Sequence, residues 1–343
     1  MTADPATAQR SMTPPGTRPA LSVVIPVFNE HRVVDRLYQR LHAVVSNLPG
    51  PYEIIVVDDG STDDTFARLH GLHQRDPELK IIRLARNFGH QAAISAGLAR
   101  AAGECVAVMD GDLQDPPELL PVLLRTVEGG CDVAYGVRTH RPEGWLKRLA
   151  YYGFYRFLRM MTTIEIPLDA GDFCVMRRQV ALAINAFPER NRFVRGLRSW
   201  FGFRQVGVPY SRDQRAAGRP KYTWGKLLRL SFDGLISFSD VPLRMASYLG
   251  FLVSAGSFVG IGIVLYFRLF TNASVPGFAS LAILILFLGG IQLLAVGLLG
   301  EYVSRIFDEV KRRPLYVMSA LIGWEGEMGH VPMASAEFPH AAS

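Results

Sequence analysis

The chain has few cysteines and no export leader at its start. Its 343 residues include three cysteines, Cys105, Cys131 and Cys174, and no two of them stand in a C-x-x-C arrangement. An odd number without that spacing leaves no complete disulfide framework, so a reducing compartment is the simplest inference. Residues 1–20 are rich in Thr, Pro and Ala and lack an apolar core, which predicts a disordered tail rather than a signal peptide.

Missing signatures narrow the classes of ligand. No G-x-G-x-x-G follows the first apolar run, which excludes the usual dinucleotide-binding pattern. Zinc-finger, RRM and helix-turn-helix signatures are also absent, so nucleic acid is not expected as a partner. Lys plus Arg exceed Asp plus Glu by 37 to 31, and the arginines crowd into residues 138–230. This regional basic character suits phosphate groups or anionic lipid headgroups.

Apolar residues make up 49% of the chain, and the excess lies between residues 246 and 300. Residues 246–267 carry no charge over 22 positions, a length of about 33 Å as a helix, which crosses a bilayer core. A second such run covers residues 278–300 after a short connection, so the two predict a transmembrane hairpin. Basic residues before and after the pair outnumber the lone Arg268 at its turn, which predicts that both termini and the remaining chain are cytoplasmic.

The first half of the chain alternates short apolar runs with amphipathic stretches. Strands are expected within the β-rich run 21–30, which ends in a turn, and at 53–57, 79–84, 104–109 and 131–135, with helices at 33–44 and 89–101 between them. Nearly continuous apolar strands separated by helices are typical of a sheet that is covered on both faces. The sequence therefore predicts an α/β domain with a parallel, right-handed, doubly wound sheet.

Acidic residues follow three of these predicted strands. Glu30 comes after the first, the Asp58–Asp59 pair after the second, and Asp110 and Asp112 after the fourth. In such a sheet the carboxyl ends of the strands share one edge, where ligands bind. Asp110, Asp112 and the nearby amide of Gln114 offer hard oxygen ligands to Mg²⁺ or Mn²⁺. The alternative is a set of acidic turns that cap helices, because Asp is common at such positions.

Three motifs carry a family resemblance. V-V-I-P-V-F-N-E at 23–30, V-V-D-D-G-S-T-D-D-T at 56–65 and D-G-D-L-Q-D-P-P-E at 110–118 resemble the nucleotide-sugar-binding half of family 2 glycosyltransferases with the GT-A fold. The sequence is similar more specifically to polyprenyl-phosphate glycosyltransferases, which include dolichol-phosphate mannose synthases and bacterial undecaprenyl-phosphate glucosyltransferases. The resemblance covers roughly 21–240 and continues through the apolar runs.

This resemblance implies roles for individual residues. The donor nucleotide would be bound by Pro26, Phe28, Glu30, Asp58, Asp59 and Asp110. Asp110, Asp112 and Gln114 would hold the metal ion against the diphosphate. Asp172, in A-G-D-F at 170–173, would be the catalytic carboxylate that orients or deprotonates the acceptor. The acceptor and its phosphate would contact Arg195, Arg212, Arg215, Lys221 and Tyr222. Pro220 stands where the family has Ser, which weakens the expectation for the last two contacts.

The expected organisation has five parts. A disordered tail (1–20) precedes the GT-A domain (21–222), juxtamembrane amphipathic helices (223–245), the hairpin (246–300) and a cytoplasmic tail (301–343). The expected activity is metal-dependent, inverting transfer of one hexose from a nucleoside-diphosphate sugar to undecaprenyl or dolichyl phosphate at the cytoplasmic face of the inner membrane. UDP-glucose is the leading donor, and the resemblance suggests a homo-oligomer such as a tetramer.

Two alternatives stay open. A processive polysaccharide synthase of the same superfamily is disfavoured because Q-x-x-R-W is absent and two spans are few for a translocation channel. A non-catalytic membrane scaffold with a degenerate nucleotide fold is disfavoured because every acidic group is present.

Overall fold

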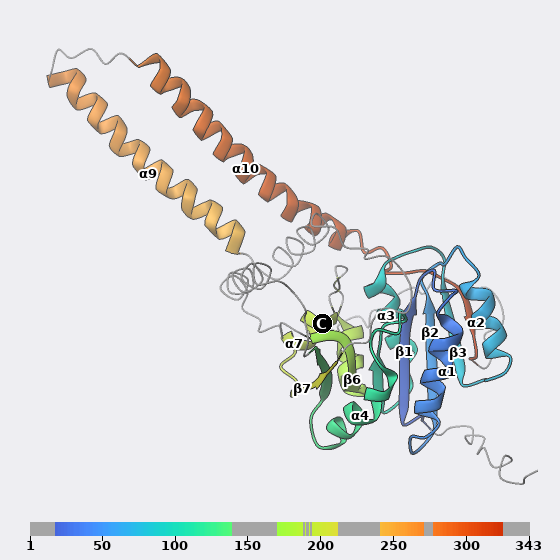
Figure 1. Cartoon of the computed structure of the whole chain (residues 1–343). Helices are drawn as coiled ribbons and strands as arrows, with labels where there is room; N and C mark the ends of the chain where they lie inside the picture. The colour runs from blue at the N-terminus through green and yellow to red at the C-terminus, as the bar shows by residue number, and fades with distance from the viewer. Residues whose placement is uncertain are drawn as a thin grey trace, which may run out of the picture. The chain divides into compact units, whose positions relative to one another are not determined.

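The computed structural model describes residues 18–138, 170–187, 189, 192, 194–211, 241–270 and 277–324. The chain divides into two compact units: residues 1–144, 166–220 and 314–343 form the first, and residues 145–165 and 221–313 form the second. Most of the predicted disordered tail and of the predicted amphipathic segment 223–245 lies outside the described residues (Figure 1).

The described part of the first unit is built on an eight-stranded sheet of order β7-β5-β6-β4-β1-β2-β3-β8. β1 is parallel to β2 and β4, β2 is parallel to β3, and β5 is parallel to β7. β6 runs antiparallel to β4 and β5, and β8 runs antiparallel to β3. The strands are β1 Leu21–Val27, β2 Tyr52–Asp58, β3 Leu79–Leu84, β4 Cys105–Val108, β5 Val133–Arg138, β6 Ala170–Arg177, β7 Gln205–Tyr210 and β8 Met318–Ile322.

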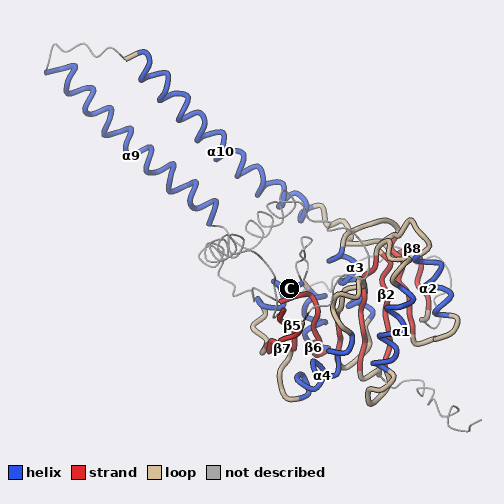
Figure 2. Tube along the Cα trace, viewed as in Figure 1, coloured by secondary structure: helices blue, strands red, loops and turns tan. Residues whose placement is uncertain are grey.

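Helices cover both faces of this sheet (Figure 2). Alternate residues of a strand point to opposite faces, so Val23 and Ile25 of β1 join one apolar core while Val24 joins the other. The first core takes in α1 Val34–Val45, α2 Thr65–His73 and α4 Leu120–Glu128, which follows the 3₁₀ turn Pro117–Leu119. The second takes in α3 His90–Arg100, α6 Arg178–Ala186 and α7 Val194–Trp200.

The predicted α/β class and the five predicted strands are confirmed, and the sheet is mostly parallel in its centre. The mostly parallel sheet that the GT-A resemblance implies is also confirmed, since only β6 and β8 of the described strands run antiparallel to their neighbours. β8 lies within residues 301–343, whose composition predicts only a tail. It closes the edge of the sheet beside β3, and an edge strand left open is a site for unwanted pairing.

Two long helices account for the described part of the second unit. α9 spans Val241–Phe270 and α10 spans Phe278–Val310, and they lie next to each other in an antiparallel arrangement (Figures 1 and 2). Among the described residues, one stretch, Phe287–Val310, is long and apolar enough to cross a membrane, and Gly250–Gly260 is a shorter apolar segment. The two-span hairpin therefore stays a prediction.

Candidate functional site

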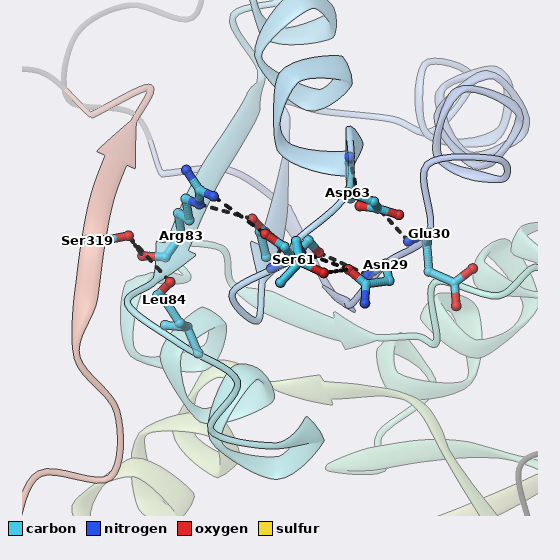
Figure 3. Close-up of polar contacts among 10 residues, drawn as sticks. Asn29, Glu30, Ser61, Asp63, Arg83, Leu84 and Ser319 are labelled. Atoms are coloured by element: carbon cyan, nitrogen blue, oxygen red, sulfur yellow. Dashed lines mark hydrogen bonds and ion pairs between the residues drawn. The ribbon is translucent and has the colours of Figure 1, made fainter.

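The loops after β1 and β2 are tied together by side-chain hydrogen bonds (Figure 3). The backbone N–H of Asn29 donates to the hydroxyl of Ser61 (2.9 Å), and the N–H of Thr62 donates to Oδ1 of Asn29 (2.9 Å). The N–H of Glu30 donates to the hydroxyl of Thr65 (2.9 Å). These loops carry the first two predicted donor motifs, so the fold brings both motifs to one edge of the sheet, where parallel strands end.

Asp58 is the last residue of β2 and is completely buried. Its Oδ1 accepts a hydrogen bond from the N–H of Ser61 (3.0 Å), and its Oδ2 lies 3.5 Å from Nε of Arg83. Within the described chain, Oδ2 accepts no hydrogen bond. A buried carboxylate oxygen in that state is ready to accept an N–H from a ligand.

Asp59 faces the loop between β3 and α3. Its two carboxylate oxygens accept hydrogen bonds from the N–H groups of Phe88 (2.8 Å) and Gly89 (3.0 Å). Gly89 has φ of +102°, which favours glycine. Burial raises the pKa of Asp59, as does the charge of Asp58, while the two backbone hydrogen bonds lower it. These contacts show that Asp59 anchors the loop that precedes α3, and its role in binding the donor nucleotide stays a prediction.

The acidic motif after β4 has a constrained backbone. Leu113, between Asp112 and Gln114, is buried and adopts φ of +60°, which is unusual for a residue with a side chain. The N–H of Gln114 donates to Oδ1 of Asp112 (3.1 Å). A Cβ on Gly111 would lie 2.8 Å from a methyl group of Val27, so only glycine lets this loop cross the end of β1. The motif is therefore a fixed loop and not a simple helix cap.

Asp172 on β6 is held by three side chains. Nε2 of His90 lies 3.4 Å from Oδ2 of Asp172, and Nη2 of Arg195 donates to its Oδ1 (3.3 Å). The amide of Gln91 also donates to Oδ2 (3.4 Å) and accepts the N–H of Val194 (2.9 Å). Residues from α3 and α7 thus fix one carboxylate.

His90 also joins this carboxylate to the acidic motif. Its Nε2 lies 3.4 Å from Oδ1 of Asp110. Asp110 and Asp172 therefore share one imidazole, although they are 62 residues apart in the chain: Asp110 follows β4, and Asp172 lies on β6, which pairs with β4. The structure brings the predicted metal-binding motif and the predicted catalytic carboxylate into one site.

The two carboxylates differ in acidity. Burial raises the pKa of Asp110 to about 6, and the charges of Asp115, Asp172 and Asp112 add to this rise, although the charge of His90 opposes it. Burial would also raise the pKa of Asp172, but the hydrogen bond with His90 and the charges of Arg195, His90 and Arg198 hold it well below its usual range. Burial lowers the pKa of His90, whereas its hydrogen bond to Asp172 and the charge of Asp110 raise it overall. Asp172 is thus kept ionised. Asp110, beside it, is stabilised when a cation is close to its carboxylate.

Several residues of the site carried no sequence signal of their own. The sequence motifs assign no role to four of them: His90, Gln91, Asp115 and Arg198. Arg198 is almost fully buried, with its guanidinium 5.0 Å from the ring centre of Tyr135. Asp115 is buried and accepts a short hydrogen bond from the hydroxyl of Tyr210. The sequence gives one indication that His90 belongs to a site: it follows a parallel strand, and ligands bind at the carboxyl ends of such strands.

The remaining predicted residues divide into described and undescribed ones. Pro26 is buried in β1, and Phe28 and Glu30 are partly exposed on the loop that follows. Arg212, Arg215, Lys221 and Tyr222 lie outside the described residues. No group of three or more His, Cys, Asp and Glu side chains converges on a metal site in the described ranges. Asp110 and Asp112 still fit a cation that takes its other ligands from a diphosphate, because Mg²⁺ commonly binds through one or two carboxylates and substrate phosphates.

Comparison with known proteins identifies relatives over most of the chain. The model of glycosyl transferase family 2 matches residues 22–184. The uncharacterized glycosyltransferase YkcC of Bacillus subtilis (strain 168) is 46% identical over 307 residues, or 89% of this chain and 95% of that protein. The bactoprenol glucosyl transferase of Shigella phage SfII is 39% identical over 300 residues, or 87% of this chain and 97% of that protein.

Solved structures are more distant. Glucosyl-3-phosphoglycerate synthase from Mycobacterium tuberculosis is 22% identical with a TM-score of 0.43, covering 64% of this chain and 79% of that one. The mannosyltransferase PcManGT from Pyrobaculum calidifontis, solved with GDP-Man and Mn²⁺, is 17% identical with a TM-score of 0.42, covering 86% of this chain and 89% of that one.

Proposed function

Because the chain belongs to glycosyl transferase family 2, we propose that it transfers one glucose from UDP-glucose to a polyprenyl phosphate at a membrane surface, with inversion at the anomeric carbon. The observation that carries this proposal is the contact of His90 with both Asp110 and Asp172. The contact joins a diphosphate-binding motif to an ionised carboxylate within one site. The relatives named bactoprenol glucosyl transferase support glucose as the sugar and a polyprenyl acceptor.

The donor side of the site consists of the loops after β1, β2 and β4. Asp58 offers a buried oxygen to an N–H of the nucleobase, and Phe28 and Glu30 lie on the adjoining loop. Asp110 and Asp112 would hold Mg²⁺ or Mn²⁺ with the help of Gln114. When bound, the ion stabilises the negative charge on the departing nucleoside diphosphate.

The acceptor side is centred on Asp172. A phosphate oxygen of the acceptor forms the new bond to the anomeric carbon while the bond to the diphosphate breaks, and the nucleoside diphosphate leaves with the electron pair. The second pKa of a phosphate monoester is about 6, so most acceptor molecules are already ionised near neutral pH. Because the pKa of Asp172 is held well below its usual range, this carboxylate acts more by orienting the acceptor than by taking its proton, while Arg195 lies beside it as a cation for the phosphate.

The second unit supplies the membrane attachment in this proposal. Large apolar side chains on α9 and α10 are more than half exposed, among them Phe251 (77%), Phe258 (73%) and Leu293 (75%). Apolar surfaces of this extent on a helix pair indicate a lipid or protein environment. We propose that α9 and α10 form a two-span hairpin with the catalytic unit on the cytoplasmic side, since the flanking basic residues outnumber the one at the turn.

The test uses the full chain in membranes or detergent with undecaprenyl phosphate, labelled UDP-glucose and Mg²⁺ or Mn²⁺. Label in a lipid that carries one sugar supports the proposal. Label in a polymer supports a processive synthase, and no turnover with UDP-glucose, GDP-mannose or other nucleotide sugars supports a non-catalytic scaffold. Protease protection of tags at the two termini and at residues 271–277 tests the hairpin: protection of the termini in inside-out vesicles would contradict the proposed topology.

A further inference from the structure

β8, the strand that follows the second unit, fixes one residue on the donor side of the sheet. Arg83 pairs with Ala320 and Leu84 with Met318, so Ser319 is an extra residue on β8 at this step. The Ser319 hydroxyl donates to the backbone oxygens of Arg83 (3.2 Å) and Leu84 (3.4 Å) (Figure 3). A bulge disrupts the regular ladder, and this hydroxyl provides hydrogen bonds at the point of disruption. β8 therefore holds the backbone of Arg83.

The side chain of Arg83 reaches from β3 to the end of β2. Its Nε lies 3.5 Å from Oδ2 of Asp58, and its Nη2 donates to the backbone oxygen of Ser61 (3.5 Å) (Figure 3). Its guanidinium lies 4.3 Å from the ring centre of Phe66 on α2, which limits its movement. Arg83 thus contacts both the buried carboxylate and the turn that follows it.

These contacts continue into the first donor loop. Ser61, whose carbonyl Arg83 binds, accepts the N–H of Asn29 through its hydroxyl, and Asn29 in turn accepts the N–H of Thr62. A shift of Ser61 would therefore displace the loop that carries Phe28 and Glu30. The Arg83 side chain is partly exposed (37%), so the alternative is an ordinary solvated arginine with no effect on this loop.

We propose that Arg83 is a positioning residue for the donor nucleotide, held by β8, which sets the carboxylate of Asp58 and the turn at Ser61. The inference rests on the proposed function, because it takes Asp58 as a nucleoside-binding residue. Donor affinity then depends on a strand from the far end of the chain, beyond the predicted membrane hairpin. Arg83 does not contact the transfer centre at Asp172, so the chemical step itself is independent of it.

The kinetic test compares the full-length Arg83→Gln variant with Arg68→Gln. Arg68 forms an ion pair with Asp35 (2.7 Å) that is exposed on both sides, which makes it a control for the loss of a surface arginine pair. We expect Arg83→Gln to raise the KM for UDP-glucose about two- to fivefold, the range of a partly exposed ion pair, with kcat unchanged from wild type. Arg83→Lys should recover part of the loss, because it keeps the charge beside Asp58. An unchanged KM in Arg83→Gln would overturn the inference.

A second measurement needs no donor. Amide hydrogen exchange of the ligand-free full chain should become faster in residues 58–65 in Arg83→Gln and in Ser319→Ala, and should stay unchanged there in Arg68→Gln. If the wild type turns over no nucleotide sugar, the proposed function fails, and this measurement still reports on Arg83. Exchange at 58–65 that stays at the wild-type rate in Arg83→Gln contradicts the inference whatever the donor is.

Discussion

Nε2 of His90 lies 3.4 Å from Oδ2 of Asp172 and at the same distance from Oδ1 of Asp110. The first residue of α3 therefore holds a carboxylate from β6 against one that follows β4. This arrangement gives each of the three residues a separable role. In the proposed function, Asp110 acts on the donor, Asp172 acts on the acceptor, and His90 sets the distance between them.

Replacing His90 should impair transfer more than donor binding. His90→Gln removes a hydrogen bond to a charged group, which amounts to about ten- to a hundredfold in kcat. The KM for UDP-glucose should stay within about threefold of wild type, because the contact of His90 with the donor side is the one to Asp110 and the other donor residues keep their own contacts. His70→Gln on the exposed face of α2 is the control. Equal losses in kcat and donor affinity would contradict the separation of roles.

Asp172→Asn keeps the shape of the side chain and removes its charge. We expect kcat to fall by at least about a hundredfold, the usual contribution of a positioned acid–base group. Donor binding, measured by calorimetry with UDP and Mn²⁺, should be preserved because Asp172 lies on the acceptor side. Asp35→Asn, in an exposed surface pair, serves as the control. Loss of UDP binding in Asp172→Asn would show that Asp172 belongs to the donor side instead.

The metal assignment predicts a specific defect in Asp112→Asn. Removal of one of two carboxylates should raise the Mn²⁺ concentration for half-maximal activity by about tenfold or more, since few protein groups hold the ion. Asp64→Asn, an exposed acid at the start of α2, should leave that concentration unchanged. Near-normal turnover with an unchanged metal dependence in Asp112→Asn would mean that this residue is not a ligand.

We expect the carboxylate of Asp63 to make a pH-dependent contribution to the stability of the folded protein. Burial would raise its pKa, but hydrogen bonds from Thr65 and His31 lower it to about 2. A lowered pKa in the folded state adds stability that is fully present above the unfolded value of about 4 and is lost as pH falls through about 2. Asp63→Asn should therefore melt at a lower temperature than wild type at pH 7, and this difference should shrink as pH falls from 4 towards 2. A difference that is constant with pH would contradict the ionic origin.

Two of the residues that the sequence predicted for the donor side, Asp58 and Asp110, each stand at the end of an apolar run. Asp58 and Asp110 stand where strands of strong pattern stop, and the parallel order of those strands dictates that their carboxyl ends meet. The central sheet and the donor edge of the site could therefore be predicted from local pattern and topology together.

The residues that it missed depend on contacts between distant segments. His90 is a single histidine at the start of a helix. Its part in the site becomes visible only in the folded chain, where β6 brings Asp172 beside it. β8 is a five-residue apolar segment after a long helix, and no local pattern specifies that its partner is β3, more than 230 residues earlier in the chain. Arg198 is buried by the packing of the folded chain. Its residue type alone predicts an exposed side chain, because arginine is rarely buried.

The place of β8 in the sheet has a consequence for biosynthesis. Until residues 318–322 leave the ribosome, β3 presents an unpaired edge with the apolar residues Ile81 and Ile82. Both long helices are made before that edge is covered, because they precede β8 in the chain. The first unit therefore completes its sheet only after both long helices have been made, and a ribosome that stops before β8 leaves a nascent chain in which the edge at β3 is exposed.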